Sequence, residues 1–237
     1  MIGGYPRSVV DEPFGQPRLG AAEARARACT RCPSLVASRS AVVVGSGPPR
    51  APVVLVTGAP GAHQDALGAA LVGRAARLVD RALADAGLAR AAVYVTPLVK
   101  CLPPGNRTPT PAEVAHCSGH LVAQVEAVEP IVVIALGAFV AKTLCGDLLP
   151  IRERRGREEP CVLGALPVWL LPVFDPAAAL YDPALAAALR ADLGRVPELL
   201  ARGRPELGTP PVEAPGTPSG DAEEPAAVAG PDQLDLF

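Results

Sequence analysis

Four cysteines constrain this chain more than any other feature of its sequence. Cys29 and Cys32 form a C-x-x-C pair, 68 residues separate Cys32 from Cys101, and 15 residues separate Cys101 from Cys117. Thiolates are soft ligands, and four of them suit either a zinc ion or an iron–sulfur cluster. The spacing alone leaves three interpretations open: a structural zinc site, a cluster, or a C-x-x-C pair with two core cysteines.

Size and charge predict one soluble domain with appendages. The chain has 237 residues, of which 49% are apolar, and this is enough for one sizeable core. The amino terminus has no signal-peptide pattern, and the longest apolar stretch, residues 131–141, is about half of a bilayer span. We therefore expect a cytoplasmic protein without a membrane partner. The whole chain carries −2 and residues 201–237 carry −5, so residues 1–200 carry +3, a weak indication of DNA binding.

The hydrophobic pattern predicts an α/β fold. Short apolar runs indicate buried strands over residues 52–56, 92–95, 131–136 and 167–171. Helices are predicted over residues 21–28, 72–86, 137–144 and 184–200, and a further helix begins at Thr110, with Pro111 in its first turn and Glu113 at its third position. This alternation predicts a three-layer sandwich with a central, mostly parallel four-stranded sheet. Such sheets bind ligands beyond the carboxyl ends of their strands.

Composition divides the chain into four parts. Residues 1–20 are rich in Gly and Pro and are expected to form an extended arm, and residues 21–202 form the folded domain. Pro, Gly, Ala and Glu then dominate without periodicity, which predicts a disordered linker over residues 203–230. Residues 231–237 form a separate terminal peptide.

The sequence around the third cysteine resembles a known family. Val95-Thr96-Pro97-Leu98-Val99-Lys100-Cys101, followed by residues 103–111 and by Cys117 one helix later, closely resembles the type 4, iron–sulfur uracil-DNA glycosylases. The resemblance covers residues 24–200 and implies the uracil-DNA glycosylase fold. It also implies a 4Fe–4S cluster on Cys29, Cys32, Cys101 and Cys117, with the structural role of pinning loops near DNA. Cys145 and Cys161 match no ligand position and are expected to be core residues.

The resemblance also identifies the positions that carry the chemistry of this family, and here they differ. A Gly-Glu-Ala-Pro-Gly turn positions the hydrolytic water in the family, whereas this chain has Thr57-Gly58-Ala59-Pro60-Gly61. Leu71 stands in place of a Phe that stacks on uracil, and Pro97 in place of an Asn that reads its edge. Asp175 stands in place of a His that stabilises the departing uracil anion. Flipping, reading and leaving-group stabilisation all depend on such groups, so we expect ordinary uracil excision to be lost or redirected.

Two carboxylates are candidates for a rebuilt catalytic site. Asp65 follows the first turn and matches an acidic residue of the family, and Asp175 stands at the position of the catalytic His. Either one could activate a water molecule. The alternatives are that Asp65 is a turn or cap residue and that Asp175 starts a turn before Pro176. His63 is expected to be a solvated loop residue.

Arginines supply the candidate phosphate contacts. Arg74 and the cluster that includes Arg154 and Arg155 match family segments near DNA, although a solvated charged face is the competing interpretation. Asn106 and Arg107 are expected to brace the loop that carries the third cysteine.

The carboxyl terminus is a second motif. Gln233, Leu234, Asp235, Leu236 and Phe237 resemble the pentapeptide by which bacterial polymerases and repair proteins bind the sliding clamp, the β subunit of the replicative polymerase. The leucines and the terminal aromatic ring suit an apolar groove, and a disordered linker would hold the body near DNA. The alternative is an apolar end that folds back onto the body.

These observations support a leading hypothesis and two alternatives. The leading hypothesis is a monomeric, nucleoid-associated bacterial DNA-repair protein that binds DNA and is tethered to the sliding clamp. Whether it is an enzyme stays open, because a working glycosylase for uracil or another damaged base, acting through Asp65 or Asp175, is the first alternative. The second is a zinc-containing partner protein without affinity for DNA.

Overall fold

A computed structural model describes residues 16–146 and 149–206. Within them, the strands are β1 (Val53–Thr57), β2 (Val93–Pro97), β3 (Val132–Leu136), β4 (Glu159–Leu163) and β5 (Leu166–Val173). The helices are α1 (Gln16–Arg27), α2 (Pro33–Ser38), α3 (Ala62–Leu67), α4 (Gly73–Asp85), α5 (Pro111–Val128), α6 (Ala138–Cys145), α7 (Ile151–Arg154), α8 (Pro176–Ala179), α9 (Pro183–Leu193) and α10 (Val196–Arg202). Two 3₁₀ turns, η1 (Arg90–Ala92) and η2 (Pro104–Asn106), precede and follow β2.

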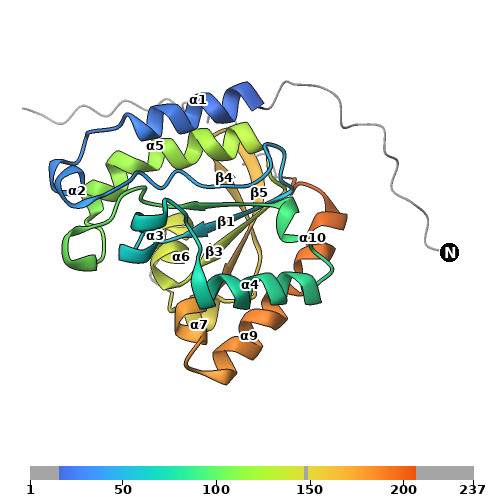
Figure 1. Ribbon diagram of the computed structural model, residues 1–237. Coiled ribbons are helices and arrows are strands. Elements are labelled where there is room, and N and C mark those ends of the chain that lie inside the picture. The colour runs from blue at the N-terminus through green and yellow to red at the C-terminus, as the bar shows by residue number, and fades with distance from the viewer. Residues whose placement is uncertain (1–15, 147–148, 207–237) are drawn as a thin grey trace, which may run out of the picture. The chain divides into compact units, whose positions relative to one another are not determined.

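The strands form one sheet in the order β2-β1-β3-β5-β4 (Figure 1). Neighbouring strands are parallel from β2 to β5, and β4 pairs antiparallel with β5. The α/β fold and the mostly parallel sheet confirm the sequence-based prediction, but the sheet has five strands where we predicted four. The strand that we missed, β4, contains Pro160 and alternates between exposed and partly buried residues. This pattern is typical of an edge strand, where a proline interrupts no ladder on its outer side.

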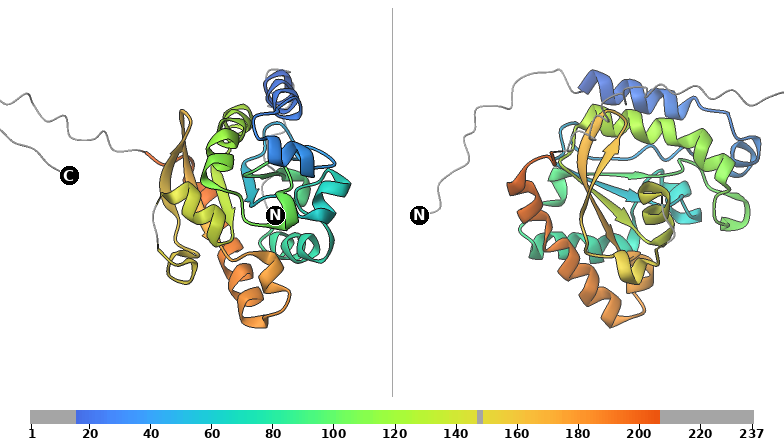
Figure 2. Two further views of the ribbon diagram at one scale, coloured as in Figure 1. Left: turned by 90° about the vertical axis from the view of Figure 1, so that its left-hand side faces the viewer. Right: turned by 180° about the vertical axis from the view of Figure 1, so that it is seen from behind.

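Helices cover both faces of the sheet and complete the three layers. One face packs against α1, α5 and α6, and the other against α4, α9 and α10. Figure 2 shows these layers from the side, with the sheet between them. The side chains of β1 and β3 that face these helices are fully buried because both strands have a neighbour on each side and a helical layer on each face.

Local sequence signals set most helix boundaries. Thr110 and Glu113 form a capping box at the start of α5, as predicted. The helix expected over residues 184–200 is instead two helices, α9 and α10, separated by Gly194 and Arg195. Pro197 in the first turn of α10 has no backbone N–H for a continuous helix, which explains the break. Helix α1 begins at Gln16, inside the segment that we expected to be an extended arm.

The folded body continues slightly past the predicted domain end at residue 202. The Arg204 guanidinium donates hydrogen bonds to the carbonyl oxygens of Glu129, Pro130 and Pro167, and the Gly203 carbonyl accepts one from Trp169. The remainder of the predicted linker and the terminal peptide lie outside the described residues. Among the helices of residues 16–146 and 149–206, none combines the length and apolar character needed to cross a bilayer.

Candidate functional site

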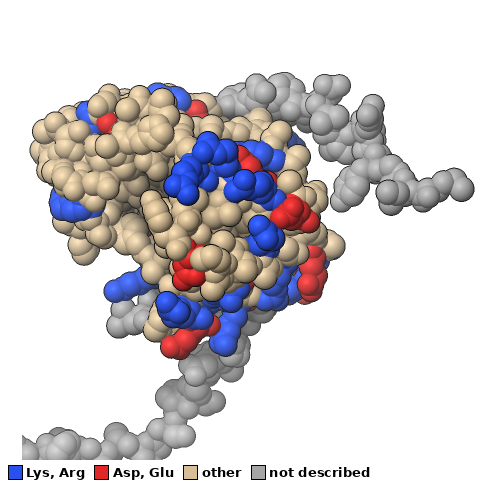
Figure 3. All heavy atoms as spheres, turned by 60° about the horizontal axis from the view of Figure 1, so that its bottom comes forward, with Lys and Arg blue, Asp and Glu red and all other residues tan. Residues whose placement is uncertain are grey.

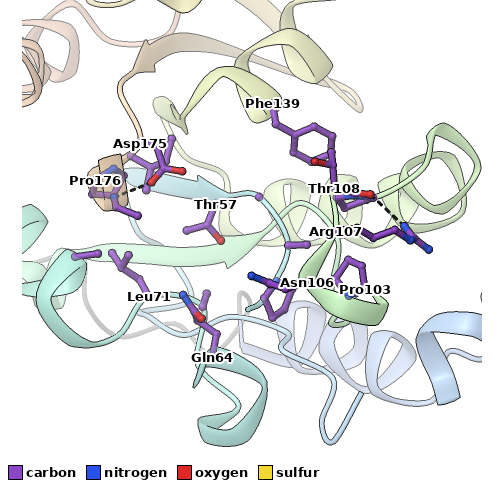
Figure 4. Close-up of a pocket in the computed structure, with 18 residues that line it drawn as sticks. Thr57, Gln64, Leu71, Pro103, Asn106, Arg107, Thr108, Phe139, Asp175 and Pro176 are labelled. Atoms are coloured by element: carbon purple, nitrogen blue, oxygen red, sulfur yellow. Dashed lines mark hydrogen bonds between the residues drawn. The ribbon is translucent and has the colours of Figure 1, made fainter. Parts of the chain in front are cut away.

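A cavity of about 340 Å³ opens at the carboxyl ends of β1, β3 and β5. The turn after β1, the segment before α4, the loop around η2, the start of α6 and the Asp175–Ala177 segment surround it (Figure 4). Its lining residues are Thr57, Gly58, Ala59, Pro60, Gln64, Ala70, Leu71, Ala75, Pro103, Asn106, Arg107, Thr108, Pro109, Leu136, Phe139, Asp175, Pro176 and Ala177. This is where ligands of parallel α/β sheets bind, because the loops that follow the strands converge there.

Most of the base-pocket positions predicted from the sequence meet in this cavity. Gly58, Ala59, Pro60, Leu71 and Asp175 all line it, although 116 residues separate Gly58 from Asp175 in the sequence. The structure thus brings three of the four replaced chemistry positions together.

Two further predicted pocket positions lie beside the lining rather than in it. Pro97 ends β2 as a buried residue, and its carbonyl oxygen accepts a hydrogen bond from Lys100 Nζ. Gly61 lies next to two pocket amides: a Cβ placed on it would lie 3.0 Å from Gln64 Oε1 and 3.3 Å from Asn106 Oδ1.

The cavity contains polar and aromatic side chains that the sequence had not assigned to it. The amides of Gln64 and Asn106 form no hydrogen bond with another described residue, and Figure 4 shows them across the cavity from Phe139 and Asp175. We had expected Asn106 only to brace a loop. Asn106 adopts a left-handed backbone conformation (φ 58°), which sets the direction of its side chain. The sequence signal for this conformation was the Gly105-Asn106 pair, which is typical of a turn. Phe139 follows the carboxyl end of β3 closely, a position that itself indicates the ligand side of the sheet.

Asp175 contributes a carboxylate to the cavity wall. Its Oδ1 accepts a 2.8 Å hydrogen bond from the Ala177 N–H and so caps the short helix α8. Gly137, with a φ of 89°, packs directly beneath it, because a Cβ there would lie 3.1 Å from the Asp175 Cβ. The carboxylate is exposed and therefore places negative charge on this wall of the cavity.

Asp65, the other candidate base, points elsewhere. It is only 2% exposed, and its two carboxylate oxygens accept hydrogen bonds from the backbone N–H groups of Ser40 (2.7 Å) and Ala41 (3.3 Å). Asp65 does not line the cavity. Its geometry is that of a structural residue which fixes the segment after α2.

The four cysteines of the motif line a second, smaller pocket together. Cys29, Cys32, Cys101 and Cys117 share it with Arg31, Arg39, Lys100, His116 and His120. The sulfurs of three cysteines accept hydrogen bonds, Cys29 from Arg31 Nε (3.4 Å), Cys101 from Arg39 (3.1 Å) and Cys117 from the Lys100 backbone N–H (3.3 Å), and the fourth, Cys32 Sγ, lies 3.6 Å from His116 Nδ1. Such donors stabilise thiolate sulfur, as either zinc or an iron–sulfur cluster would need.

The environment of these thiols is mixed. Burial raises the pKa of Cys101 and of Cys117. For Cys29, burial also acts to raise the pKa, but the hydrogen bonds from Arg31 and the positive charges of Arg31 and Arg39 together lower it. In the part of the chain that the structure describes, no three His, Cys, Asp or Glu side chains converge as they would around one metal ion. Cys145 and Cys161 lie apart from this pocket.

One loop belongs to both pockets. The segment between Cys101 and Cys117 supplies Pro103, Asn106, Thr108 and Pro109 to the wall of the larger cavity. Glu113 holds this loop, because its carboxylate accepts hydrogen bonds from Arg107 (2.7 and 2.8 Å), from the Thr110 N–H and from Ser34 of α2. Glu113 therefore fixes the loop that forms one wall of the cavity and that lies between two cysteines of the second pocket.

The arginines proposed as phosphate contacts lie in different environments. Arg154 is 6% exposed and forms an ion pair with Glu159, and Arg155 forms one with Asp192 and lies 5.4 Å from the centre of the Phe174 ring. The first ion pair joins α7 to β4, and the second joins the residue after α7 to α9. Arg74, by contrast, is exposed on α4, next to the cavity residue Ala75.

Comparison with known proteins confirms the predicted family. A family model described as "Uracil DNA glycosylase superfamily" matches residues 44–193. A type-4 uracil-DNA glycosylase of Archaeoglobus fulgidus is 35% identical over 183 residues, which cover 76% of this chain and 92% of that protein. That of Saccharolobus solfataricus is 33% identical over 180 residues (74% and 83%), and that of Thermotoga maritima is 46% identical over 114 residues (48% and 59%). The chain therefore belongs to the uracil DNA glycosylase superfamily and, within it, to the type-4 uracil-DNA glycosylase family.

Proposed function

We propose that this protein is a DNA-binding member of the type-4 family in which ordinary uracil excision is lost or redirected. One observation carries the proposal: the cavity is retained, but Gly58, Leu71 and Asp175 line it in place of the carboxylate, ring and imidazole expected there. The relatives named above are uracil-DNA glycosylases, and DNA repair is the function of that family.

The substitutions act against uracil hydrolysis in specific ways. Removing a positioned acid or base costs on the order of 10²–10⁴ in rate, and removing a stacking ring costs about 1–3 kcal/mol of binding. Asp175 adds an unfavourable charge, because the uracil leaving group becomes negative in the transition state. Phe139, Gln64 and Asn106 still offer a ring and two amides, which suits base binding more than base hydrolysis.

We further propose that the four pocket cysteines hold a 4Fe–4S cluster. When bound, the cluster would act as a structural crosslink. Cys101 and Cys117 would then anchor the loop between them, and with it the cavity wall that contains Asn106. Arg31, Arg39 and the Lys100 N–H would stabilise the thiolates.

A working glycosylase for another base is the second candidate, and the structure bears on which residue would serve it. Asp175 faces the cavity, whereas Asp65 is buried and engaged by backbone N–H groups. If this protein excises a base, Asp175 is the acid or base that we assign.

Single-turnover excision assays distinguish the two candidates. Cluster-loaded protein in excess would be mixed with oligonucleotides containing uracil, hypoxanthine, xanthine or a thymine mismatch, in single and double strands. We expect DNA binding without abasic product. Product that disappears in Asp175→Ala would overturn this proposal, provided that it persists in Asp182→Ala. Asp182 is the matched control, because it also precedes a proline and caps a helix but does not line the cavity.

We also propose that residues 233–237 bind the bacterial sliding clamp and that residues from 207 to 230 serve as the linker. The proposal rests on the sequence motif, since these residues lie outside the described part of the chain. Binding of the full chain to purified clamp would be measured by surface plasmon resonance. Leu236→Ala with Phe237→Ala should abolish binding, and Val228→Ala should not. Undiminished binding by the double variant would exclude the motif.

A further inference from the structure

Helix α4 presents three arginines on one exposed face. Arg74, Arg77 and Arg81 follow one another at i, i+3 and i+7, a spacing that places them within about 60° of arc on an α-helix. All three are exposed, and none forms an ion pair or hydrogen bond with another described residue. We call these three residues the α4 arginine row.

Many arginines near this helix are neutralised, which sets the row apart. Among the described residues, the ion pairs on this side of the sheet include Arg90–Asp80, Arg190–Asp85, Arg155–Asp192, Arg195–Glu158 and Arg202–Glu158. Asp85, at the end of α4, lies on the same side of the helix as the row. It forms an ion pair with Arg190 at 3.1 Å. The positive charge of the row is therefore uncompensated. Basic side chains gather on the face that Figure 3 brings forward.

The row begins at the rim of the cavity. Leu71, just before α4, and Ala75, in its first turn, both line the cavity, and Arg74 lies between them in sequence. From Arg74 to Arg81 the helix advances about 10 Å, at 1.5 Å per residue. The row thus leads outward from the site where a base would bind.

We propose that the α4 arginine row binds consecutive backbone phosphates of the DNA strand whose base lies at the cavity. This inference rests on the proposed DNA-binding function and assigns the surface that performs it. One strand of DNA advances 3.4 Å per nucleotide, so about 10 Å of helix matches roughly three nucleotides. Phosphates are the partner that this surface fits, because the exposed large apolar residues of the described chain, which a protein partner would use, lie on other elements.

The salt dependence of DNA binding tests the assignment. Affinities of the cluster-loaded full chain for labelled single-stranded and duplex oligonucleotides would be measured by fluorescence anisotropy over a range of KCl concentrations. Each phosphate contact contributes about 0.9 to the slope of log K against log[salt] for duplex DNA and about 0.7 for single strands. Arg77→Gln with Arg81→Gln should therefore lower the slope by about 1.8 for duplex DNA or by about 1.4 for single-stranded DNA. The form of DNA whose affinity falls more is the form that the row binds.

A matched control separates local contacts from net charge. Arg18 and Arg25 are exposed arginines of α1, across the sheet, with no ion pair to another described residue. Arg18→Gln with Arg25→Gln removes the same charge and should leave the slope unchanged. Equal losses in both double variants, or an unchanged slope in the α4 variant, would overturn the assignment. Absence of DNA binding by the unmodified protein would instead contradict the proposed function itself. Because all four side chains are exposed, thermal unfolding should be similar for all these proteins.

Discussion

Asp65 accepts a 2.7 Å hydrogen bond from the backbone N–H of Ser40, a residue 25 positions earlier in the chain. This contact joins α3, which follows the turn after β1, to the segment after α2, the helix that follows the C-x-x-C pair. It explains why an acidic residue belongs at this position even when the hydrolytic carboxylate at position 58 is absent. The residue is needed for the fold whether or not the protein excises a base.

The two candidate catalytic aspartates should therefore differ in their effect on stability. Asp65→Ala leaves the N–H groups of Ser40 and Ala41 without their acceptor in a buried setting and should cost about 2–4 kcal/mol. Asp175→Ala removes one cap from a four-residue helix and should cost about 1 kcal/mol. Urea unfolding of the two variants measures the difference. A smaller loss for Asp65→Ala than for Asp175→Ala would contradict the structural role of Asp65.

Glu113 should make stability depend on acidity. Hydrogen bonds from Arg107, and from the Thr110 N–H, lower the pKa of Glu113 from 4.5 to about 2. Because the folded-state pKa lies below the unfolded one, the ionised carboxylate stabilises the folded protein above about pH 4.5. This contribution is lost as the pH falls toward about 2.

The variant Glu113→Gln isolates this effect. The urea midpoint of the unmodified protein should exceed that of Glu113→Gln near neutral pH, and the gap should narrow at about pH 3. Comparing the two proteins at each pH removes the effect of acid on the cysteine site, which they share. A gap that stays constant across this range would show that the Glu113 carboxylate does not stabilise the loop through its charge.

The cysteine pocket should hold iron through its four thiolates. Anaerobically purified protein should absorb near 400 nm, and Cys101→Ser should lose this absorbance together with bound iron. Cys161→Ser is the control, because Cys161 lies outside the pocket. A colourless protein that contains one zinc ion would show the zinc site that the cysteine spacing also allows.

Restoring the family's chemistry should restore excision. Gly58 has no left-handed backbone, and a Cβ there would lie 3.6 Å from the Phe139 ring, an ordinary contact, so Gly58→Glu adds a carboxylate without backbone strain. Combined with Leu71→Phe, Pro97→Asn and Asp175→His, it should raise single-turnover uracil excision at least 10²-fold.

A control with a carboxylate placed elsewhere accompanies this restoration. Gly119→Glu adds a carboxylate at an exposed position of α5, away from the cavity, and should have no effect on excision. If the variant with all four substitutions binds DNA but gains no uracil excision, then sequence differences beyond these four positions have altered the site.

The family, the α/β layers and the four cysteines that share a pocket could all be predicted from the amino-acid sequence. Short apolar runs separated by helical periodicity are sufficient for a parallel sheet, because a strand buried on both faces must be apolar throughout. The capping box at Thr110 and Glu113 was also readable, since it depends only on residues three apart. The edge strand β4 was not readable, because Pro160 and partial exposure hide its period.

Which polar residues can act together could be seen only in three dimensions. Asp65 and Asp175 were both candidates in the sequence, yet the structure buries Asp65 against backbone N–H groups and places Asp175 at the cavity. In the sequence, Arg154 and Arg155 resembled phosphate contacts, but in the structure they form ion pairs with Glu159 and Asp192. The α4 arginine row forms no such pair with a described residue. The physical reason is that burial and ion pairing depend on residues far apart in the chain, and local sequence does not encode those distances.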